Sequence, residues 1–335
     1  MSIAAASRMT IGLVGPDWDA ALPTLQPLGG NDLCTVVAHR EGHDPDFLVL
    51  YGDVAGALTT TVPRARRVIV LSEPEGILRY QPGFLNQFGY AISPFALPGF
   101  TGKLVLSHPA IPWFFGCRFG QGRKPSWAYS FEQLLELPLP AKRNAISAVL
   151  SRKSQTPLHR ARVAFAEELQ AAFPGAVEIF GSGFNPIDDK ADAITPFRFH
   201  LAVENTRHAC YWSEKFADAL LGWSLPVYDG CTEMAELFPH GSFVPVNVND
   251  VQPTLRSIGT LLDAQERAVN LDSLREARAT LLYEHSLPAV LRRALSAEHA
   301  ATTIAPLSKP ETLMPNSGFT LKGRLRRLVK GWAAR

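Results

Sequence analysis

Short runs of apolar residues, many of them β-branched, recur along the chain, and amphipathic or loop-like stretches separate them. In the first half, the apolar runs lie at residues 10–14, 47–51, 68–71 and 104–106. In the second half, they lie at residues 145–150, 177–180, 200–203, 226–228 and 243–246. Strands that alternate with helices are typical of mostly parallel, doubly wound sheets. The pattern therefore predicts two α/β domains, the second of them Rossmann-like.

Turn-forming and basic residues separate the two series of strands. Residues 116–142 include the stretch GCRFGQGRKPSW and one short predicted helix, which is typical of an interdomain connection. We therefore predict an N-terminal domain at 1–118, a connection at 119–141, a second domain at 142–300 and a basic tail at 301–335.

Composition places the chain among soluble globular proteins. Its 335 residues are 46% hydrophobic and 19% charged, which is enough for large cores. The four cysteines are scattered and show no CxxC or Cys/His spacing, so neither a disulfide framework nor a metal site is indicated. The N-terminus lacks the pattern of a signal peptide, and no segment approaches the roughly 20 apolar residues of a membrane-spanning helix. We therefore expect a cytoplasmic protein.

Positive charge is concentrated at the C-terminus. The formal net charge is +2, and the six basic residues that follow Pro315 leave a net −4 for the rest of the chain. This distribution excludes a nucleic-acid binder by charge. Apolar residues from Phe319 to Trp332 interleave with the basic residues at near-helical spacing, which is typical of a helix on an anionic membrane surface. We expect peripheral contact with the inner face of a membrane through residues 319–335, with a disordered solubilising tail as the alternative.

The segment from Phe197 to Cys231 places a buried strand, a polar turn and a helix start in succession. The strand ends in Glu204-Asn205, and Ser213 can cap a helix that runs toward Gly222. In open α/β sheets, a helix start near the carboxyl end of a strand binds anions, because unpaired N–H groups and the helix dipole both favour negative charge. The segment therefore predicts an anion site.

Lys215 strengthens this prediction. A cation in the first turn of a helix opposes the macrodipole at a cost of roughly 0.3 to 1 kcal/mol, and a bound diphosphate would compensate it. The alternative is a solvated surface lysine beside Glu214. For Glu204 and Asn205, the alternative is that they satisfy the amides of the turn.

Three blocks within this segment resemble the donor-binding motif of glycosyltransferase family 10, the α-1,3-fucosyltransferases. They are FRFHLAVENT, YWSEK and LPVYDG, and they occur in the family's order. The flanking stretches AISAVLSRKS and LFPHGSFVPVNVND are also similar to the family. The resemblance covers residues 142 to about 285 well and the first domain only loosely.

The resemblance implies a GT-B architecture, in which two Rossmann-like domains face a cleft. It also implies transfer of L-fucose from GDP-fucose to an acceptor glycan, with inversion and without an essential divalent metal. Glu214 and Lys215 match the pair that holds ribose and diphosphate. Arg162 matches the diphosphate arginine, with Arg160 as the alternative if the register slips by two. The donor-binding residues implied are Arg162, Glu204, Asn205, Tyr211, Ser213, Glu214 and Lys215.

Inverting transfer needs a general base that takes the proton of the acceptor hydroxyl. Glu73 is our candidate, because it follows an apolar run and RVIVLSEPE resembles the family's strand and Gly-Glu turn. Glu75 is the second choice, and an exposed loop acid is the plainer interpretation. His108 and Trp113 are candidates for the acceptor side, with core packing as the alternative for Trp113.

The sequence departs from the family pattern at several positions, of which Asp229 matters most. This residue is expected close to the sugar, so a GT-B transferase with a different nucleotide sugar stays an alternative. The divergent first domain keeps a third alternative, a noncatalytic protein that binds a sugar or nucleotide. Three short motifs are interpreted as turns, namely Asp44-Pro45-Asp46, Asp188-Asp189 and Gly181-Ser182-Gly183.

Overall fold

The computed structural model describes residues 8–15, 17–29, 34–40, 44–54, 56–74, 76–118, 124–152, 157–301 and 308–319. The chain divides into two compact units. Unit 1 consists of residues 1–22, 29–109 and 290–335, and unit 2 consists of residues 23–28 and 110–289. Each unit contains one parallel sheet with helices, which confirms the predicted α/β fold with two Rossmann-like parts.

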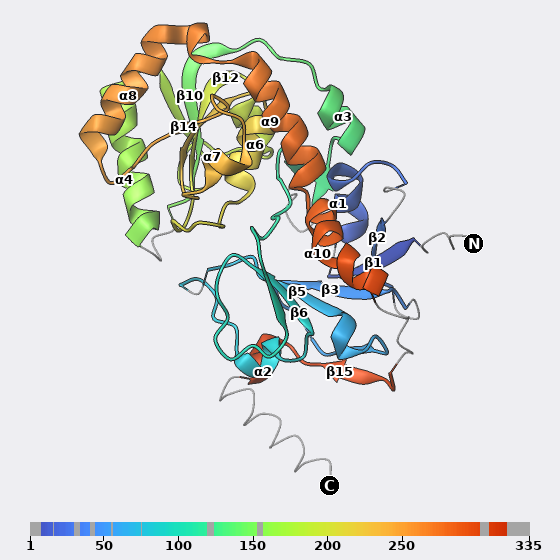
Figure 1. Cartoon of the computed structure of the whole chain (residues 1–335). Helices are drawn as coiled ribbons and strands as arrows, with labels where there is room; N and C mark the ends of the chain where they lie inside the picture. The colour runs from blue at the N-terminus through green and yellow to red at the C-terminus, as the bar shows by residue number, and fades with distance from the viewer. Residues whose placement is uncertain are drawn as a thin grey trace. The chain divides into compact units, whose positions relative to one another are not determined.

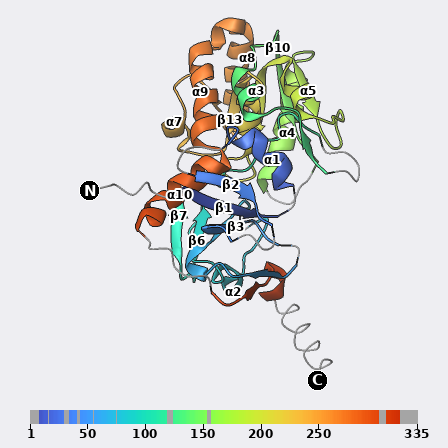
Figure 2. The same cartoon turned by 90° about the vertical axis from the view of Figure 1, so that its right-hand side faces the viewer.

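The sheet of unit 1 has six parallel strands in the order β2-β1-β3-β5-β6-β7. Their bounds are β1 (Met9–Val14), β2 (Cys34–Ala38), β3 (Phe47–Tyr51), β5 (Arg67–Val70), β6 (Tyr90–Ser93) and β7 (Lys103–Leu106). The helices α1 (Trp18–Leu25), α2 (Pro82–Leu85) and α10 (Leu287–Ala301) are also present. Figure 2 shows α10 beside β1 and β2, while α2 lies on the opposite face and packs on the core through Phe84 and Leu85.

The segment after α10 belongs in part to unit 1. Strand β15 (Glu311–Leu313) pairs antiparallel with β4 (Leu58–Thr60), and the side chain of Leu313 is buried. Phe319 packs against α2, since a Cβ atom on Gly83 would lie 2.5 Å from its ring. Phe319, expected in the membrane-binding segment 319–335, is half-buried and packs against the core of unit 1, and membrane contact through that segment stays a prediction. The basic residues from 322 onward lie outside the described residues.

The sheet of unit 2 has five parallel strands in the order β11-β10-β12-β13-β14. Their bounds are β10 (Arg143–Val149), β11 (Val177–Phe180), β12 (Phe197–Val203), β13 (Leu225–Asp229) and β14 (Val244–Pro245). The helices are α3 (Phe131–Glu136), α4 (Pro157–Ala172), α5 (Lys190–Ile194), α6 (Glu214–Leu221), α7 (Met234–Leu237), α8 (Val251–Ala264) and α9 (Leu271–Glu284). A short antiparallel pair, β8 (Cys117–Arg118) and β9 (Ser126–Trp127), lies outside this sheet.

Helices cover both faces of the sheet in unit 2. Figure 1 shows α4 and α8 on one side and α6 and α9 on the other. Apolar residues of α4 and α8, including Phe165, Leu169 and Ile258, pack on the strands in one continuous core. The apolar residues of α4 recur at helical intervals, so they form one face, which the helix buries against the sheet.

The boundary between the units differs from the predicted one. Residues 110–141, predicted to end the first domain and connect it to the second, belong to unit 2. Phe131 of α3 makes an edge contact with Tyr283 of α9, with ring centroids 5.2 Å apart. From residue 290 onward the chain belongs to unit 1. Long-range packing between segments distant in sequence sets these boundaries, so local composition does not reveal them.

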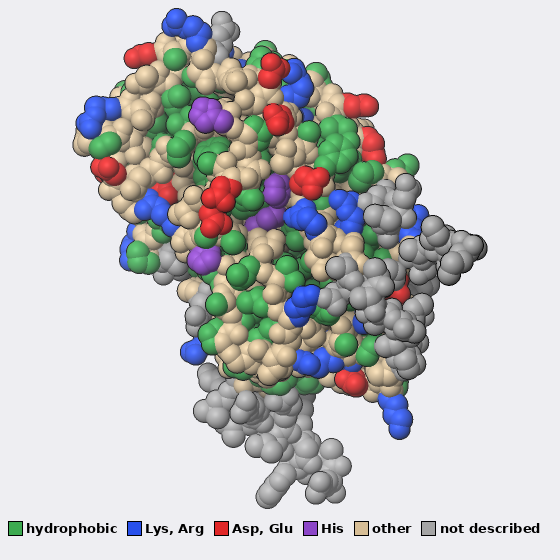
Figure 3. Space-filling view, in the orientation of Figure 1, with side chains coloured by type: hydrophobic (Ala, Val, Ile, Leu, Met, Phe, Trp, Pro, Cys, Tyr) green, Lys and Arg blue, Asp and Glu red, His purple; other side chains and the backbone are tan. Residues whose placement is uncertain are grey.

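The surface of unit 2 is mixed in charge. On the face shown in Figure 3, acidic and basic side chains are interspersed over this unit and do not form one patch of a single sign. Across the described part of the chain, no helix combines the length and the apolar character that spanning a bilayer requires.

A buried histidine joins the two central strands of unit 2. His200 on β12 is 3% exposed, and its Nδ1 lies 2.7 Å from Ser147 Oγ on β10. Burial, together with the positive charges of Lys190 and Lys142, lowers the pKa of His200 to about 3. The folded protein therefore keeps this imidazole neutral at pH values where the unfolded chain protonates it.

Because His200 is neutral in the folded protein, we expect the protein to lose stability at acidic pH. The pKa of His200 in the folded protein lies below its unfolded value of about 6.5. Its contribution to the free energy of unfolding is therefore complete above pH 6.5 and is lost as the pH falls toward 3. By pH 5 the loss should reach roughly 2 kcal/mol. In urea unfolding at pH 7.5 and pH 5, His200→Gln should lose less stability than the wild type. The same exchange at the exposed His240 is the matched control, and equal pH slopes for His200→Gln and wild type would contradict the prediction.

Candidate functional site

The predicted anion site lies where the strand order of unit 2 reverses. From β10 the chain crosses through α4 to β11 on one side, and then through α5 to β12 on the other side of β10. At such a switch point the connections leave the sheet in opposite directions and open a crevice at the carboxyl ends of the strands. Glu204 and Asn205 directly follow β12, so the topology brings them to this crevice.

Ser213 and Glu204 together fix the start of α6. Ser213 is the N-cap residue with φ −136° and ψ −171°, and its Oγ accepts a hydrogen bond from the Lys215 N–H at 3.4 Å. Its own N–H donates to Glu204 Oε1 at 2.8 Å, and its hydroxyl donates to Glu204 Oε2 at 2.6 Å. The predicted cap is confirmed, and the fully buried carboxylate of Glu204 holds it in place.

The ammonium group of Lys215 lies inside this arrangement. Its Nζ is 3.0 Å from Ser213 Oγ, 3.3 Å from Glu214 Oε1 and 3.6 Å from Glu204 Oε2. The side chain is only 20% exposed, so the alternative of a solvated surface lysine is wrong. Burial disfavours its charge, but the carboxylates of Glu214 and Glu204 outweigh burial and raise the pKa of Lys215.

A second lysine extends the network on the other side of Glu214. Lys190, the first residue of α5, lies 3.5 Å from Glu214 Oε1 and 2.7 Å from Asp218 Oδ2. Burial opposes ionisation of Glu214, but the two ammonium groups overcome it and lower the pKa of Glu214 to about 2. Glu204, Lys215, Glu214, Lys190 and Asp218 thus alternate in charge along one buried chain of contacts. Lys190 and Asp218 were not predicted as site residues.

Arg162 reaches the same crevice from α4. The residue is 5% exposed, and its Nη1 donates a hydrogen bond to Asn205 Oδ1 at 2.6 Å. Burial lowers the pKa of Arg162, although the carboxylates of Glu204 and Glu214 oppose this shift. Its buried Nε has no hydrogen-bond partner within the part of the chain that the structure describes. A buried, unsatisfied N–H is costly, so Arg162 has a donor available for a ligand. Arg160 is exposed.

Two glycines allow close approach beside the crevice. A Cβ atom on Gly230 would lie 2.4 Å from Glu204 Cγ and 2.5 Å from the Tyr228 hydroxyl. Gly181 has φ +109°, and a Cβ atom there would lie 2.1 Å from the Leu150 carbonyl oxygen at the end of β10. The glycines of LPVYDG and GSG therefore let the backbone pack tightly at the carboxyl edge of the sheet. Tyr211 is the remaining predicted donor-binding residue. It lies in the loop between β12 and α6, and its side chain is 1% exposed.

The residues predicted in the first half fall into both units. Glu73 follows β5 and His108 follows β7, so both lie at the carboxyl edge of the sheet in unit 1. Glu75 lies outside the described residues. Trp113 belongs to unit 2, where it is 1% exposed and its Nε1 donates to Thr24 Oγ1 at 3.1 Å. Trp113 is thus a core residue, which was the alternative interpretation.

The acidic pairs of the sequence have structural partners. Asp46 accepts a hydrogen bond from the Thr10 N–H at 2.8 Å, and Asp44 accepts one from the Thr61 hydroxyl. Asp189 caps α5 by accepting from the Ala191 N–H at 2.8 Å. These acids were interpreted as turn residues, but Asp189 is a helix cap, and Asp44 and Asp46 accept hydrogen bonds from residues distant in sequence. Over the described ranges, no group of three or more His, Cys, Asp or Glu side chains is arranged to hold a metal ion.

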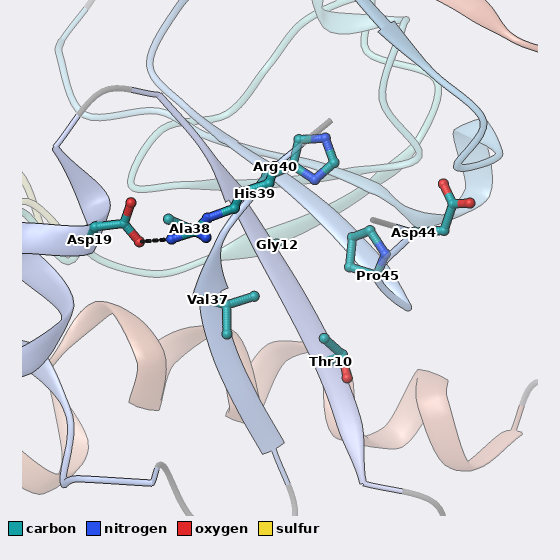
Figure 4. Close-up of a pocket in the computed structure, with 9 residues that line it drawn as sticks. All are labelled: Thr10, Gly12, Asp19, Val37, Ala38, His39, Arg40, Asp44 and Pro45. Carbon is teal, nitrogen blue, oxygen red and sulfur yellow. Dashed lines mark ion pairs between the residues drawn. The ribbon is translucent and has the colours of Figure 1, made fainter. Parts of the chain in front are cut away.

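Unit 1 contains a separate pocket of about 390 Å³ beside β1 and β2 (Figure 4). An ion pair of 3.5 Å between Arg40 and Asp19 crosses its rim, and both side chains are 72% exposed. None of the predicted site residues lines it. Its lining residues are Thr10, Gly12, Asp19, Val37, Ala38, His39, Arg40, Asp44 and Pro45.

Comparison with known proteins bears on unit 2. Residues 139–268 match the model of the family described as glycosyltransferase family 10 (fucosyltransferase), C-terminal domain. Residues 139–268 are therefore similar to the C-terminal domain of glycosyltransferase family 10. The match confirms the resemblance found in the sequence and the enzyme class, a glycosyltransferase. It spans all five strands of the unit 2 sheet and every predicted donor-binding residue.

Solved structures show weaker similarity. An α1,3-fucosyltransferase crystallised with GDP is 21% identical, with 83% of this chain and 84% of that chain covered and a TM-score of 0.48. An α1,3-fucosyltransferase with GDP-fucose is 19% identical, with 92% and 95% covered and a TM-score of 0.47. A glycosyltransferase from Rickettsia africae ESF-5 is 12% identical, with 89% and 100% covered and a TM-score of 0.44. At this low identity, the GDP and GDP-fucose in those structures are not evidence for a ligand of this chain. No curated protein matches the sequence.

Proposed function

We propose that this glycosyltransferase moves L-fucose from GDP-fucose to a hydroxyl group of an acceptor glycan, with inversion at the anomeric carbon. The observation that carries the proposal is the convergence of two cationic side chains at the switch point of unit 2. Lys215 reaches it from the start of α6, and Arg162 reaches it from α4 with an unsatisfied N–H. A diphosphate supplies the oxygen acceptors that both groups can use.

The proposed mechanism relies on electrostatic stabilisation of the departing GDP. Negative charge grows on the diphosphate as the bond to the sugar breaks, so fixed donors aimed at it lower the barrier. Lys215, Arg162 and the first N–H groups of α6 supply such donors, so in this proposal a divalent metal is not essential. Glu73 acts as the general base that accepts the proton of the attacking hydroxyl. The acceptor is a glycan that presents this hydroxyl to unit 1.

Thermal unfolding with nucleotides tests the donor assignment. At about 100 times its dissociation constant, a ligand that binds only the folded state adds roughly 2.7 kcal/mol, which corresponds to several degrees in Tm for a chain of this size. GDP should raise Tm by this amount, and UDP and CMP should not. Equal shifts with GDP and UDP would reject the guanine nucleotide, and no shift with any of the three would reject the site.

Two other functions keep part of this assignment. A GT-B transferase with a different sugar would show the GDP shift but would not hydrolyse or transfer GDP-fucose. A noncatalytic protein would bind the nucleotide sugar and leave it intact. Slow hydrolysis of GDP-fucose by the wild type, followed as free fucose, separates both alternatives from the proposed activity.

A further inference from the structure

An arginine and a carboxylate are locked together at the end of β13, next to the crevice. Arg207 donates hydrogen bonds through Nε and Nη2 to the two carboxylate oxygens of Asp229. The same Nη2 also donates to Asn247 Oδ1. This two-point contact fixes the plane of the guanidinium group, because both N–H bonds must align with the carboxylate.

Asp229 is not available to a ligand as a free carboxylate. The residue is 3% exposed, and besides Arg207 it binds the Val248 N–H, which donates to Oδ2 at 2.8 Å. A buried carboxylate that is paired and hydrogen-bonded in this way is neutralised in place. Asp229 can therefore affect a ligand only through its ion-pair partner, Arg207.

Arg207 still has hydrogen-bonding capacity. A guanidinium group has five N–H donors, and those of Nη1 make no hydrogen bond within the described residues. Its side chain is 32% exposed, whereas Asp229 is buried. The free edge of a rigid guanidinium group is thus accessible to a ligand.

The position of this edge links it to the proposed donor site. Arg207 is two residues from Asn205, the partner of Arg162. The Glu204 N–H donates to the Asp229 carbonyl oxygen at 2.9 Å, so the ends of β12 and β13 are in register here. Adjacent strands lie about 4.8 Å apart, so Arg207 lies roughly one strand away from the proposed diphosphate position.

We propose that Arg207 is a specificity-determining residue that donates hydrogen bonds to hydroxyl oxygens of the donor sugar, and that Asp229 positions it. This inference rests on the proposed function. The ion pair is neutral overall, which suits an uncharged sugar with several hydroxyl groups. Its hydrogen-bond partners, Asp229 and Asn247, are both polar, as expected for a group that binds hydroxyl oxygens.

Calorimetric titration of the full chain with GDP and with GDP-fucose tests the proposal. Arg207→Gln should bind GDP within about twofold of the wild type and GDP-fucose roughly 10- to 100-fold more weakly, because a hydrogen bond from a charged donor to the sugar is lost. Arg207→Lys should also weaken GDP-fucose binding, since a single ammonium cannot keep both contacts with Asp229 and reach the sugar. A wild type that binds neither ligand would refute the proposed function itself.

The double variant Arg207→Gln/Asp229→Asn separates recognition from folding. Paired amides can still link the loop to β13 without a guanidinium group. If Arg207 acts only as a structural link, this variant should restore GDP-fucose binding, and that result would overturn the proposal. Equal losses for GDP and GDP-fucose in Arg207→Gln, or no loss for either, would overturn it as well. A persistent loss for GDP-fucose alone supports it.

Discussion

Replacing Lys215 with methionine should weaken GDP binding roughly 100- to 1000-fold and leave the protein folded. Two unit charges 4 Å apart interact by about 4 kcal/mol at an effective dielectric constant of 20, and each 1.4 kcal/mol is tenfold in affinity. The neutral variant would lose this attraction for the diphosphate. It would also leave Glu204 and Glu214 closer to the ligand's negative charge without the ammonium between them.

Lys215 is held loosely enough to accept a ligand. Its distances to Glu214 and Glu204, 3.3 and 3.6 Å, exceed the 2.7–2.9 Å of strong charge-assisted hydrogen bonds, so a phosphate oxygen can replace a carboxylate oxygen. Lys190 continues to pair with Glu214 when Lys215 is replaced. Glu204 likewise keeps both hydrogen bonds from Ser213. The fold should therefore survive the substitution.

Titration of GDP, with thermal melts of each variant, measures the effect. Lys103→Met, at an exposed lysine of β7 in unit 1, is the matched control and should bind GDP as the wild type does. Lys215→Arg keeps the positive charge and should retain most of the affinity. If folded Lys215→Met bound GDP with unchanged affinity, the diphosphate role of this lysine would be wrong.

The local part of the site could be predicted from the sequence. A run of aromatic and aliphatic residues forms β12, Ser213 caps α6, and Gly222 ends that helix. These signals depend on residues close together in the sequence, so they can be recognised without the tertiary structure. The cap that Asp189 forms with the Ala191 N–H is local in the same way, whereas the contact of Asp44 with Thr61 joins residues 17 apart.

The charge pairs of the site could not be predicted in this way. Lys190 and Asp218 are 28 residues apart, and Arg207 and Asp229 are 22 apart. Each pair meets only because the tertiary structure brings together two residues that are distant in sequence. The choice between Arg160 and Arg162 has the same cause, since the turn of α4 that faces Asn205 depends on how the helix packs on the sheet.

The unit boundary was missed for a related reason. The chain returns to unit 1 at residue 290 and adds β15 to β4, a pairing between segments about 250 residues apart. Composition suggested a free basic tail, because Phe319 and its neighbours have near-helical spacing. In the structure the Phe319 ring packs against Gly83 of α2, a contact between residues distant in sequence that local spacing does not reveal.

Replacing Glu73 with glutamine should lower turnover of GDP-fucose with an acceptor roughly 100- to 10,000-fold, which is the usual contribution of a positioned general base. Glutamine keeps the size and one carbonyl oxygen of the side chain but accepts no proton. Glu73 lies in unit 1, whereas the proposed nucleotide site lies in unit 2. Binding of GDP should therefore stay as in the wild type, and the loss should appear in kcat.

Glu75→Gln is the matched control, because this second acid lies two residues further along the sequence. We expect this variant to keep turnover within a fewfold of the wild type. If Glu75→Gln lost most of its turnover and Glu73→Gln lost none, the general base would be Glu75. Full turnover in both variants would show that neither Glu73 nor Glu75 is the general base, because an amide cannot accept the proton that inverting transfer releases.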